Sequence, residues 1–199
     1  MSRITHIFFD IGSTLVDETE CYNHRIRDMI AGTDITFEQF CEKAKLLGFG
    51  EAIKFFGLTK TPWHSEDERL YPDTAEILQY LCDRGYTLGI IANQAAGTEQ
   101  RLDKWGIRQY FSSVTASSEE GVAKPDFEIF RRALEKAGCS ADCSVMVGDR
   151  LDNDIAPAKA LGMKTVWIKQ GMSVYSSPQG DFEQPVYTIA NLTELKRIF

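Results

Sequence analysis

The spacing of apolar residues changes along the chain and divides it into three parts. Residues 4–9 form a short apolar run, rich in β-forming side chains, that ends at Asp10 and predicts a buried first strand. From about residue 17 to residue 70 the spacing is helical without a convincing strand, and Thr36 with Gln39 predicts a capping box at one helix start. Beyond Pro72, strand-like and helical segments alternate to the end of the chain.

The alternating part predicts a parallel sheet. Apolar runs predict strands at residues 87–92, 112–116, 144–147, 164–168 and 186–189. Helices are expected between them, with starts predicted at Asp73, Asp126 and Asn191 and a further helix at residues 153–161. Strands that alternate with helices are typical of right-handed βαβ units covered on both faces. We therefore expect a doubly wound α/β core at residues 1–16 and 71–199, with residues 17–70 inserted after the first strand as a small helical cap.

Polar side chains follow four of the predicted strands. They are Asp10, Asn93, Lys124 and Asp149, and Asp154 comes shortly after the last of these. The carboxyl ends of parallel strands share one edge of the sheet, where ligands bind in folds of this kind. Carboxylates beside an ammonium group suit a hard divalent cation next to a phosphoryl group. The pattern therefore predicts such a site at this edge.

Composition narrows the choice of partners and location. A net charge of −7 disfavours binding to nucleic acid and to anionic membranes. No apolar run approaches the roughly 18 residues of a membrane span, and no signal-peptide pattern is visible. The five cysteines form no C-x-x-C pair, which favours reduced thiols in the cytoplasm, and the three histidines lack metal-ligand spacing, so we assign them no role. The sequence leaves the oligomeric state open.

Four motifs occur in order along nearly the whole chain. They are IFFDIGSTLVD at residues 7–17, GIIANQ at 89–94, GVAKPDFEIF at 121–130 and VGDRLDNDI at 147–155. Together they resemble the haloacid dehalogenase superfamily, and the helical insertion at 17–70 sits where that family places its cap. The resemblance implies a Mg²⁺-dependent phosphatase that acts on a small phosphorylated metabolite.

The same resemblance implies a role for each motif residue. Asp10 would be the nucleophile that forms an aspartyl-phosphate. The Mg²⁺ ligands would be Asp10, the backbone carbonyl of Gly12, Asp149 and Asp154. Lys124 would be a second catalytic residue, balancing charge on the phosphoryl oxygens.

Phosphate binding would fall to residues near these ligands. The resemblance assigns it to Lys124, to Asn93 and to backbone amides of the turn after the nucleophile, at Ser13 and Thr14.

Two positions depart from the family pattern. The phosphatases carry a second aspartate two residues after the nucleophile, as general acid and base, and here that position is Gly12, which would also suit a turn that needs a special backbone angle. Such a group is worth roughly 10²- to 10⁴-fold in rate. Ala92 stands where a hydroxyl residue is usual, at a cost of about 0.5–1.5 kcal/mol. By position alone, Asp17 or Glu18 is a candidate for the substitute acid.

These departures leave alternatives to a slow phosphatase. One is a protein that binds a phosphorylated ligand without turnover. Another is a phosphonatase-like hydrolase, which would need a Schiff-base lysine in the insertion, and the candidates are Lys43, Lys45, Lys54 and Lys60. Dehalogenases of the family work without metal and lack the arrangement at residues 148–154, so this chemistry is disfavoured.

Overall fold

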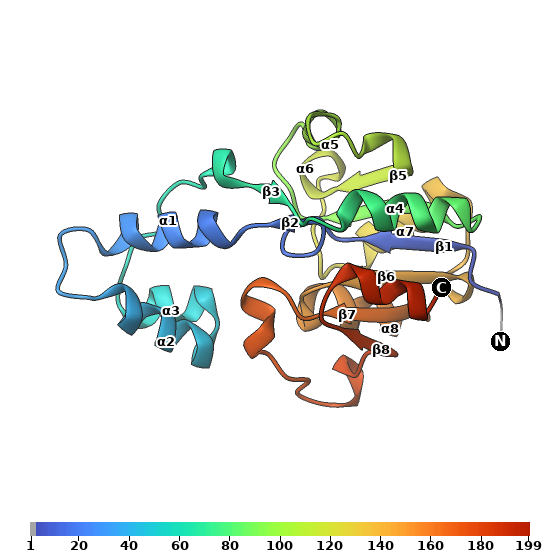
Figure 1. The fold of residues 1–199 in the computed structure, drawn as a ribbon. Coiled ribbons are helices and arrows are strands. Elements are labelled where there is room, and N and C mark those ends of the chain that lie inside the picture. Colours follow the sequence, from blue (N-terminus) through green and yellow to red (C-terminus); the bar gives the residue numbers. More distant parts are fainter. Residues whose placement is uncertain (1–2) are drawn as a thin grey trace.

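One six-stranded parallel sheet forms the centre of the computed structural model, which describes residues 3–199 (Figure 1). In spatial order the strands are β5 (Phe111–Ala116), β4 (Thr87–Ala92), β1 (His6–Phe9), β6 (Ser144–Gly148), β7 (Lys164–Ile168) and β8 (Tyr187–Ile189). β1 and β6 lie at the centre, so the residues that follow them reach the middle of the carboxyl edge. The predicted parallel sheet is confirmed.

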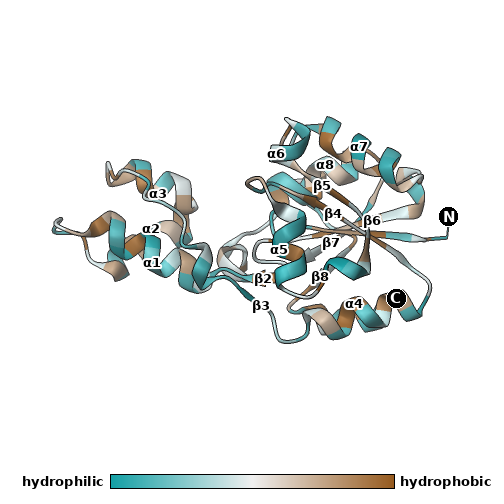
Figure 2. Ribbon diagram, turned by 90° about the horizontal axis from the view of Figure 1, so that it is seen from above, coloured by the Kyte–Doolittle hydropathy of each residue, from teal (hydrophilic) through white to brown (hydrophobic). Residues whose placement is uncertain are grey.

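Both faces of the sheet are buried because consecutive apolar residues of a strand point to opposite faces. In β1, Ile7 and Phe9 belong to one hydrophobic cluster and Phe8 belongs to the other. Helices α4 (Thr74–Asp83) and α5 (Thr98–Lys104) contribute to the first cluster, whereas α7 (Phe127–Ala137) and α8 (Ala156–Ala160) contribute to the second. Full burial of each large apolar side chain is worth about 1.5–3 kcal/mol. This is the doubly wound fold that the sequence predicts, and Figure 2 shows its apolar strands between the flanking helices.

Three helices within residues 17–70 pack on one another, apart from the sheet (Figure 1). They are α1 (Thr19–Ile30), α2 (Phe37–Leu47) and α3 (Phe49–Phe55). Their shared cluster includes Phe40, which is fully buried. The predicted capping box is confirmed, because Thr36 Oγ1 accepts from the Gln39 amide at 3.2 Å and Gln39 Oε1 accepts from the Thr36 amide at 2.8 Å. No helix among residues 3–199 is both long enough and apolar enough to cross a membrane.

The absence of strands from residues 17–70 was a wrong prediction. β2 (Val16–Asp17) pairs antiparallel with β3 (Arg69–Leu70), where the helical insertion leaves and rejoins the core. Such short strands carry no hydrophobic period, so the sequence pattern cannot reveal them.

Three other local predictions need correction. The helix expected at residues 153–161 is a π-helical turn at Leu151–Ile155 followed by α8, and the helix expected at Asn191 is a 3₁₀-helix at Leu192–Arg197. Asp73 does not cap α4, because its Oδ2 accepts at 2.9 Å from both the amide and the hydroxyl of Thr193. The tertiary contact takes the carboxylate away from the helix end.

Candidate active site

Asp10 lies directly after β1 at the carboxyl edge of the sheet. Its amide donates to the Val147 carbonyl at 2.9 Å, which ties it to the end of the neighbouring strand β6. The turn that follows is closed by Ser13 at a φ of +54°, a left-handed conformation that costs a non-glycine residue about 1–2 kcal/mol. Gly12 does not adopt a positive φ, so the left-handed angle expected there falls one residue later.

Lys124 reaches the same place from the loop after β5. Its ammonium is buried and lies 2.6 Å from Asp10 Oδ1 and 2.5 Å from Asp154 Oδ1. Burial alone would lower the pKa of Lys124, but the two carboxylates outweigh it and raise the pKa above its ordinary value. The lysine is therefore a fixed positive charge beside Asp10.

Three carboxylates meet around this lysine. One oxygen from each of Asp10, Asp149 and Asp154 lies within 4.8 Å of the others. Asp149 and Asp154 are buried, and the side chain of Asp10 is 13% exposed. Burial, and then the charges of Asp154 and Asp10, raise the pKa of Asp149 well above its usual range. One ammonium cannot balance three carboxylates, so the cluster favours an additional cation.

The donor set fits Mg²⁺. Buried carboxylate oxygens that converge on one point are the ligands that a hard divalent cation prefers. Asp154 Oδ2 also accepts from the Arg150 amide at 3.0 Å, which orients this carboxylate from behind. The spatial convergence predicted for Asp10, Asp149 and Asp154 is therefore observed, whereas a ligand role for the Gly12 carbonyl stays a prediction.

The side chain of Asn93 contacts the backbone of Lys124. Asn93 Nδ2 donates to the Lys124 carbonyl at 2.9 Å, and the Lys124 amide donates to Asn93 Oδ1 at 2.8 Å. Each polar group of the amide thus has one partner in the lysine loop, and Nδ2 keeps a second hydrogen. A direct phosphate contact by Asn93 stays a prediction. Asn93 positions the lysine loop.

The turn amides expected to bind phosphate are also engaged. Ser13 N donates to the Val16 carbonyl at 2.8 Å and Thr14 N donates to the Ile11 carbonyl at 3.3 Å. Both amides therefore donate hydrogen bonds that close the turn. Thr14 Oγ1 is buried without a hydrogen-bond partner among the described residues. A substrate contact by Ser13 or Thr14 stays a prediction.

The side chain of Glu18 reaches the turn after Asp10. The sequence made it a candidate only because it follows this turn closely along the chain. A Cβ atom built on Gly12 would lie 2.6 Å from Glu18 Oε1 and 2.7 Å from Oε2. Burial, together with the charges of Asp10 and Glu68, raises the pKa of Glu18 to about 8. Asp17 has a different contact, because its Oδ1 accepts from the Thr19 amide at 2.9 Å at the start of α1.

A cleft of about 550 Å³ opens between the helical insertion and the segment that follows β7. It is lined by α1, α2 and the segment Gly171–Tyr175 that follows β7. A Cβ on Gly171 would lie 2.6 Å from Ser13 Oγ, so this segment packs directly against the turn after Asp10. The insertion and the loop after β7 therefore border one space beside the turn.

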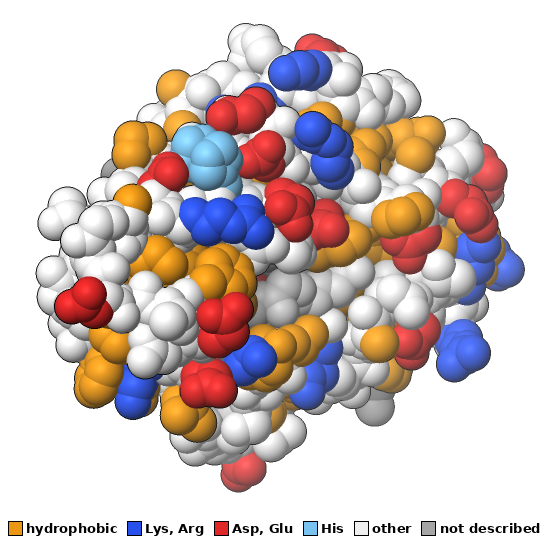
Figure 3. Space-filling view, turned by 60° about the vertical axis from the view of Figure 1, so that its left-hand side comes forward, with side chains coloured by type: hydrophobic (Ala, Val, Ile, Leu, Met, Phe, Trp, Pro, Cys, Tyr) orange, Lys and Arg blue, Asp and Glu red, His pale blue; other side chains and the backbone are white. Residues whose placement is uncertain are grey.

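Acidic and basic side chains are interspersed on the face drawn in Figure 3. The exclusion of nucleic acid as a partner stays a prediction.

The candidate Schiff-base lysines lack a buried setting. Lys45, Lys54 and Lys60 are exposed, and Lys43 Nζ stands 4.1 Å from the ring centroid of Phe55. A Schiff-base lysine is usually activated by desolvation or by a neighbouring cation. The structure therefore gives no support to the phosphonatase alternative.

Known proteins resemble this chain in both sequence and fold. The family model for haloacid dehalogenase-like hydrolases matches residues 7–168. A glyceraldehyde 3-phosphate phosphatase of Methanocaldococcus jannaschii is 32% identical over 96% of this chain and 95% of its own length, and one of Pyrococcus furiosus is 30% identical over 100% and 92%. The crystal structure of a HAD phosphatase from Thermococcus onnurineus superposes with a TM-score of 0.66 at 27% identity, covering 98% of this chain and 97% of that one.

Proposed function

The chain belongs to the haloacid dehalogenase-like hydrolase family, and from this premise we propose that it is a Mg²⁺-dependent phosphatase acting on a small phosphorylated metabolite. One observation carries the proposal. Asp10, Asp149 and Asp154 converge around the buried ammonium of Lys124, at the carboxyl edge of the sheet. The relatives named above, which act on glyceraldehyde 3-phosphate, support a phosphate ester of a small molecule as the substrate.

The proposed reaction has two displacements at phosphorus. A carboxylate oxygen of Asp10 attacks the phosphorus atom and the alcohol leaves, and water then attacks the same phosphorus and frees Asp10. Lys124 holds Asp10 in place and offers positive charge to the phosphoryl oxygens. Bound by Asp10, Asp149 and Asp154, Mg²⁺ would neutralise negative charge on the phosphate. Asn93 supports this arrangement through the backbone of Lys124.

A cytoplasmic location is part of the proposal. It is supported by the cysteines, because all five have free thiols in the structure.

Metal dependence gives the first test. Purified protein with Mg²⁺ should release phosphate from p-nitrophenyl phosphate, acetyl phosphate or glyceraldehyde 3-phosphate. Excess EDTA should reduce the rate to background, because the carboxylate cluster then lacks its cation. Adding back Mg²⁺ should restore the rate, which a phosphate-release assay measures.

Two results would count against the proposal. An unchanged rate in EDTA would exclude a role for the metal in the reaction. Mg²⁺-dependent ligand binding in a calorimeter, without turnover of any ester, would instead support the non-catalytic alternative suggested by Gly12 and Ala92.

A further inference from the structure

The proposed reaction needs a proton donor that its other residues do not supply. When Asp10 displaces an alcohol from phosphorus, the leaving oxygen needs a proton unless it is already a stable anion, and the attacking water must later lose one. Asp149 and Asp154 are assigned to the cation, and Lys124 is held by two carboxylates. One more acidic side chain is required next to Asp10.

Glu18 occupies the space in which such a group is missing. Both carboxylate oxygens and the Cδ atom lie within 2.8 Å of the point where a side chain on Gly12 would begin. Ser13 Oγ donates to Glu18 Oε2 at 3.3 Å and so links the carboxyl group to the catalytic turn. A larger residue at position 12 would displace this carboxylate, which is the far end of a flexible side chain. The Glu18 carboxyl group therefore occupies space that Gly12 leaves free.

We propose that Glu18 is the general acid and general base of the reaction, an assignment that rests on the proposed phosphatase function. In the first step a carboxylate oxygen of Asp10 bonds to phosphorus, the bond from phosphorus to the ester oxygen breaks, and the proton of the Glu18 carboxyl group passes to that oxygen. In the second step Glu18 takes a proton from water, the water oxygen bonds to phosphorus, and the bond to Asp10 breaks. Both carboxyl groups return to their starting states.

The isosteric variant Glu18→Gln tests this assignment through the leaving group. Nitrophenolate is a weak base that leaves without a proton, so the variant should still be phosphorylated by p-nitrophenyl phosphate but should release the phosphate slowly. Rapid mixing should show a burst of nitrophenolate equal to the enzyme concentration, followed by a slow steady rate. An alkyl ester such as glycerol 1-phosphate should give no burst and a rate reduced roughly 10²- to 10⁴-fold.

Asp17→Asn is the matched control, since it removes a neighbouring carboxylate whose contact is the Thr19 amide. It should keep the wild-type rate on both esters. A Glu18→Gln variant that loses no activity, or that loses it equally on both esters without a burst, would overturn the assignment while leaving the proposed function intact. A wild-type protein that hydrolyses no ester would overturn both.

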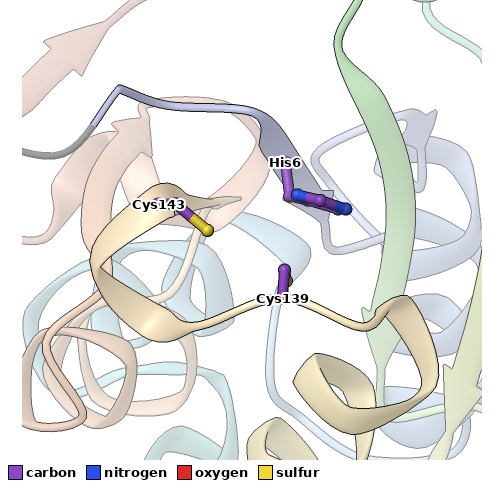
Figure 4. Close-up of side chains that lie close together, drawn as sticks. All are labelled: His6, Cys139 and Cys143. Carbon is purple, nitrogen blue, oxygen red and sulfur yellow. The ribbon is translucent and has the colours of Figure 1, made fainter.

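A different cluster lies at the opposite edge of the sheet. His6 is the first residue of β1, Cys139 follows α7, and Cys143 immediately precedes β6, and Figure 4 shows their side chains close together. One ligand atom from each residue lies within 4.8 Å of the others, and all three residues are half-buried. The amino ends of the strands therefore bring together two thiols and an imidazole.

Neighbouring polar groups already orient this cluster. Thr5 Oγ1 lies 2.9 Å from His6 Nδ1, and the imidazole also hydrogen-bonds to the Ala137 backbone. The pKa of Cys143 is lowered by hydrogen bonds, of which the one from the Ser140 side chain has the largest effect. Metal-binding histidines are commonly held in this way by backbone carbonyls.

We infer that His6, Cys139 and Cys143 form a binding site for a thiophilic cation of the Zn²⁺ class, with water as the fourth ligand. Tetrahedral Zn²⁺ with bonds of about 2.3 Å to sulfur and about 2.0 Å to nitrogen places its ligands roughly 3.5–3.8 Å apart. The ligand atoms, which lie within 4.8 Å of one another, would have to approach by no more than about 1.3 Å to reach that geometry. The ion would tie the connection between α7 and β6 to the start of β1.

Cobalt is the probe that separates this site from the carboxylate cluster. Reduced protein saturated with Mg²⁺ should bind one equivalent of Co²⁺ with a near-ultraviolet band from thiolate-to-cobalt charge transfer, which carboxylates do not produce. Zn²⁺ should remove the band and raise the melting temperature. Cys139→Ser and His6→Asn should lose both effects. Cys82→Ser, which alters a thiol outside the cluster that bonds to the Tyr110 carbonyl, should keep them. No band, or a band that survives in Cys139→Ser, would overturn the inference.

Discussion

Replacing Asp10 by Asn is expected to lower phosphate release by roughly 10⁴- to 10⁶-fold, the usual range for loss of a nucleophile. The neutral amide cannot form the aspartyl-phosphate, and it also removes one carboxylate from the proposed cation site. Asn has nearly the same shape, and Lys124 retains its contact with Asp154, so the fold should persist. Steady-state phosphate release and the melting temperature measure the two effects.

Asp152→Asn is the control for this variant. Asp152 comes from the same motif as Asp149 and Asp154, but its side chain is 60% exposed and pairs with Arg150, so the variant should keep its activity. Comparable rates for Asp10→Asn and wild type would mean that another residue is the nucleophile. Trapping of labelled phosphate on the wild-type protein, and its absence in Asp10→Asn, would confirm the covalent step directly.

The core of the fold was predictable because its signals are local. The strands at residues 87–92 and 164–168 were predicted with the observed bounds, since buried apolar runs mark a strand that is covered on both faces. Asp126 accepts from the Glu128 amide and Gly138 ends α7 at a φ of +63°, as helix-start and helix-end residues are expected to do. These strands and helix ends depend only on residues that are close together in the sequence.

The active-site cluster was predictable for a different reason. Strand ends of a parallel sheet meet at one edge, so the order of the motifs alone brings Asp10, Lys124 and Asp149 together. The position of a residue at a strand end predicts which residues lie near it, but it does not predict the hydrogen bonds of its side chain. We therefore missed that Asn93 binds the backbone of Lys124, which depends on the path of the loop after β5.

The remaining features arise from tertiary packing that no sequence period records. The position of the Glu18 carboxyl group depends on how the chain leaves the turn toward α1, and only the missing side chain of Gly12 hinted at it. His6 lies far from Cys139 and Cys143 in sequence, and the pairing of β1 with β6 brings them together. Ligand spacing, the signal used for histidines and cysteines, cannot detect a site assembled across strands.

The expected cost of Lys124→Met in stability is about 3–5 kcal/mol in the absence of divalent cations. The lysine is buried between Asp10 and Asp154, and its removal leaves two carboxylates without their common cation. Urea unfolding in EDTA measures this loss. Mg²⁺ should recover more stability in the variant than in the wild type, because it then replaces the buried positive charge that Lys124 supplied. Activity should still be at least roughly 10²- to 10³-fold lower, since Lys124 no longer stabilises the phosphoryl oxygens.

Lys136→Met separates this effect from the general removal of a lysine. Lys136 also contacts a carboxylate, that of Glu120, but its side chain is 44% exposed, so the loss should not exceed about 1 kcal/mol. Equal stability of Lys124→Met and wild type in EDTA would mean that the buried carboxylates are neutral without the lysine. The cluster would then carry no excess of negative charge, and the electrostatic argument that it attracts Mg²⁺ would fail.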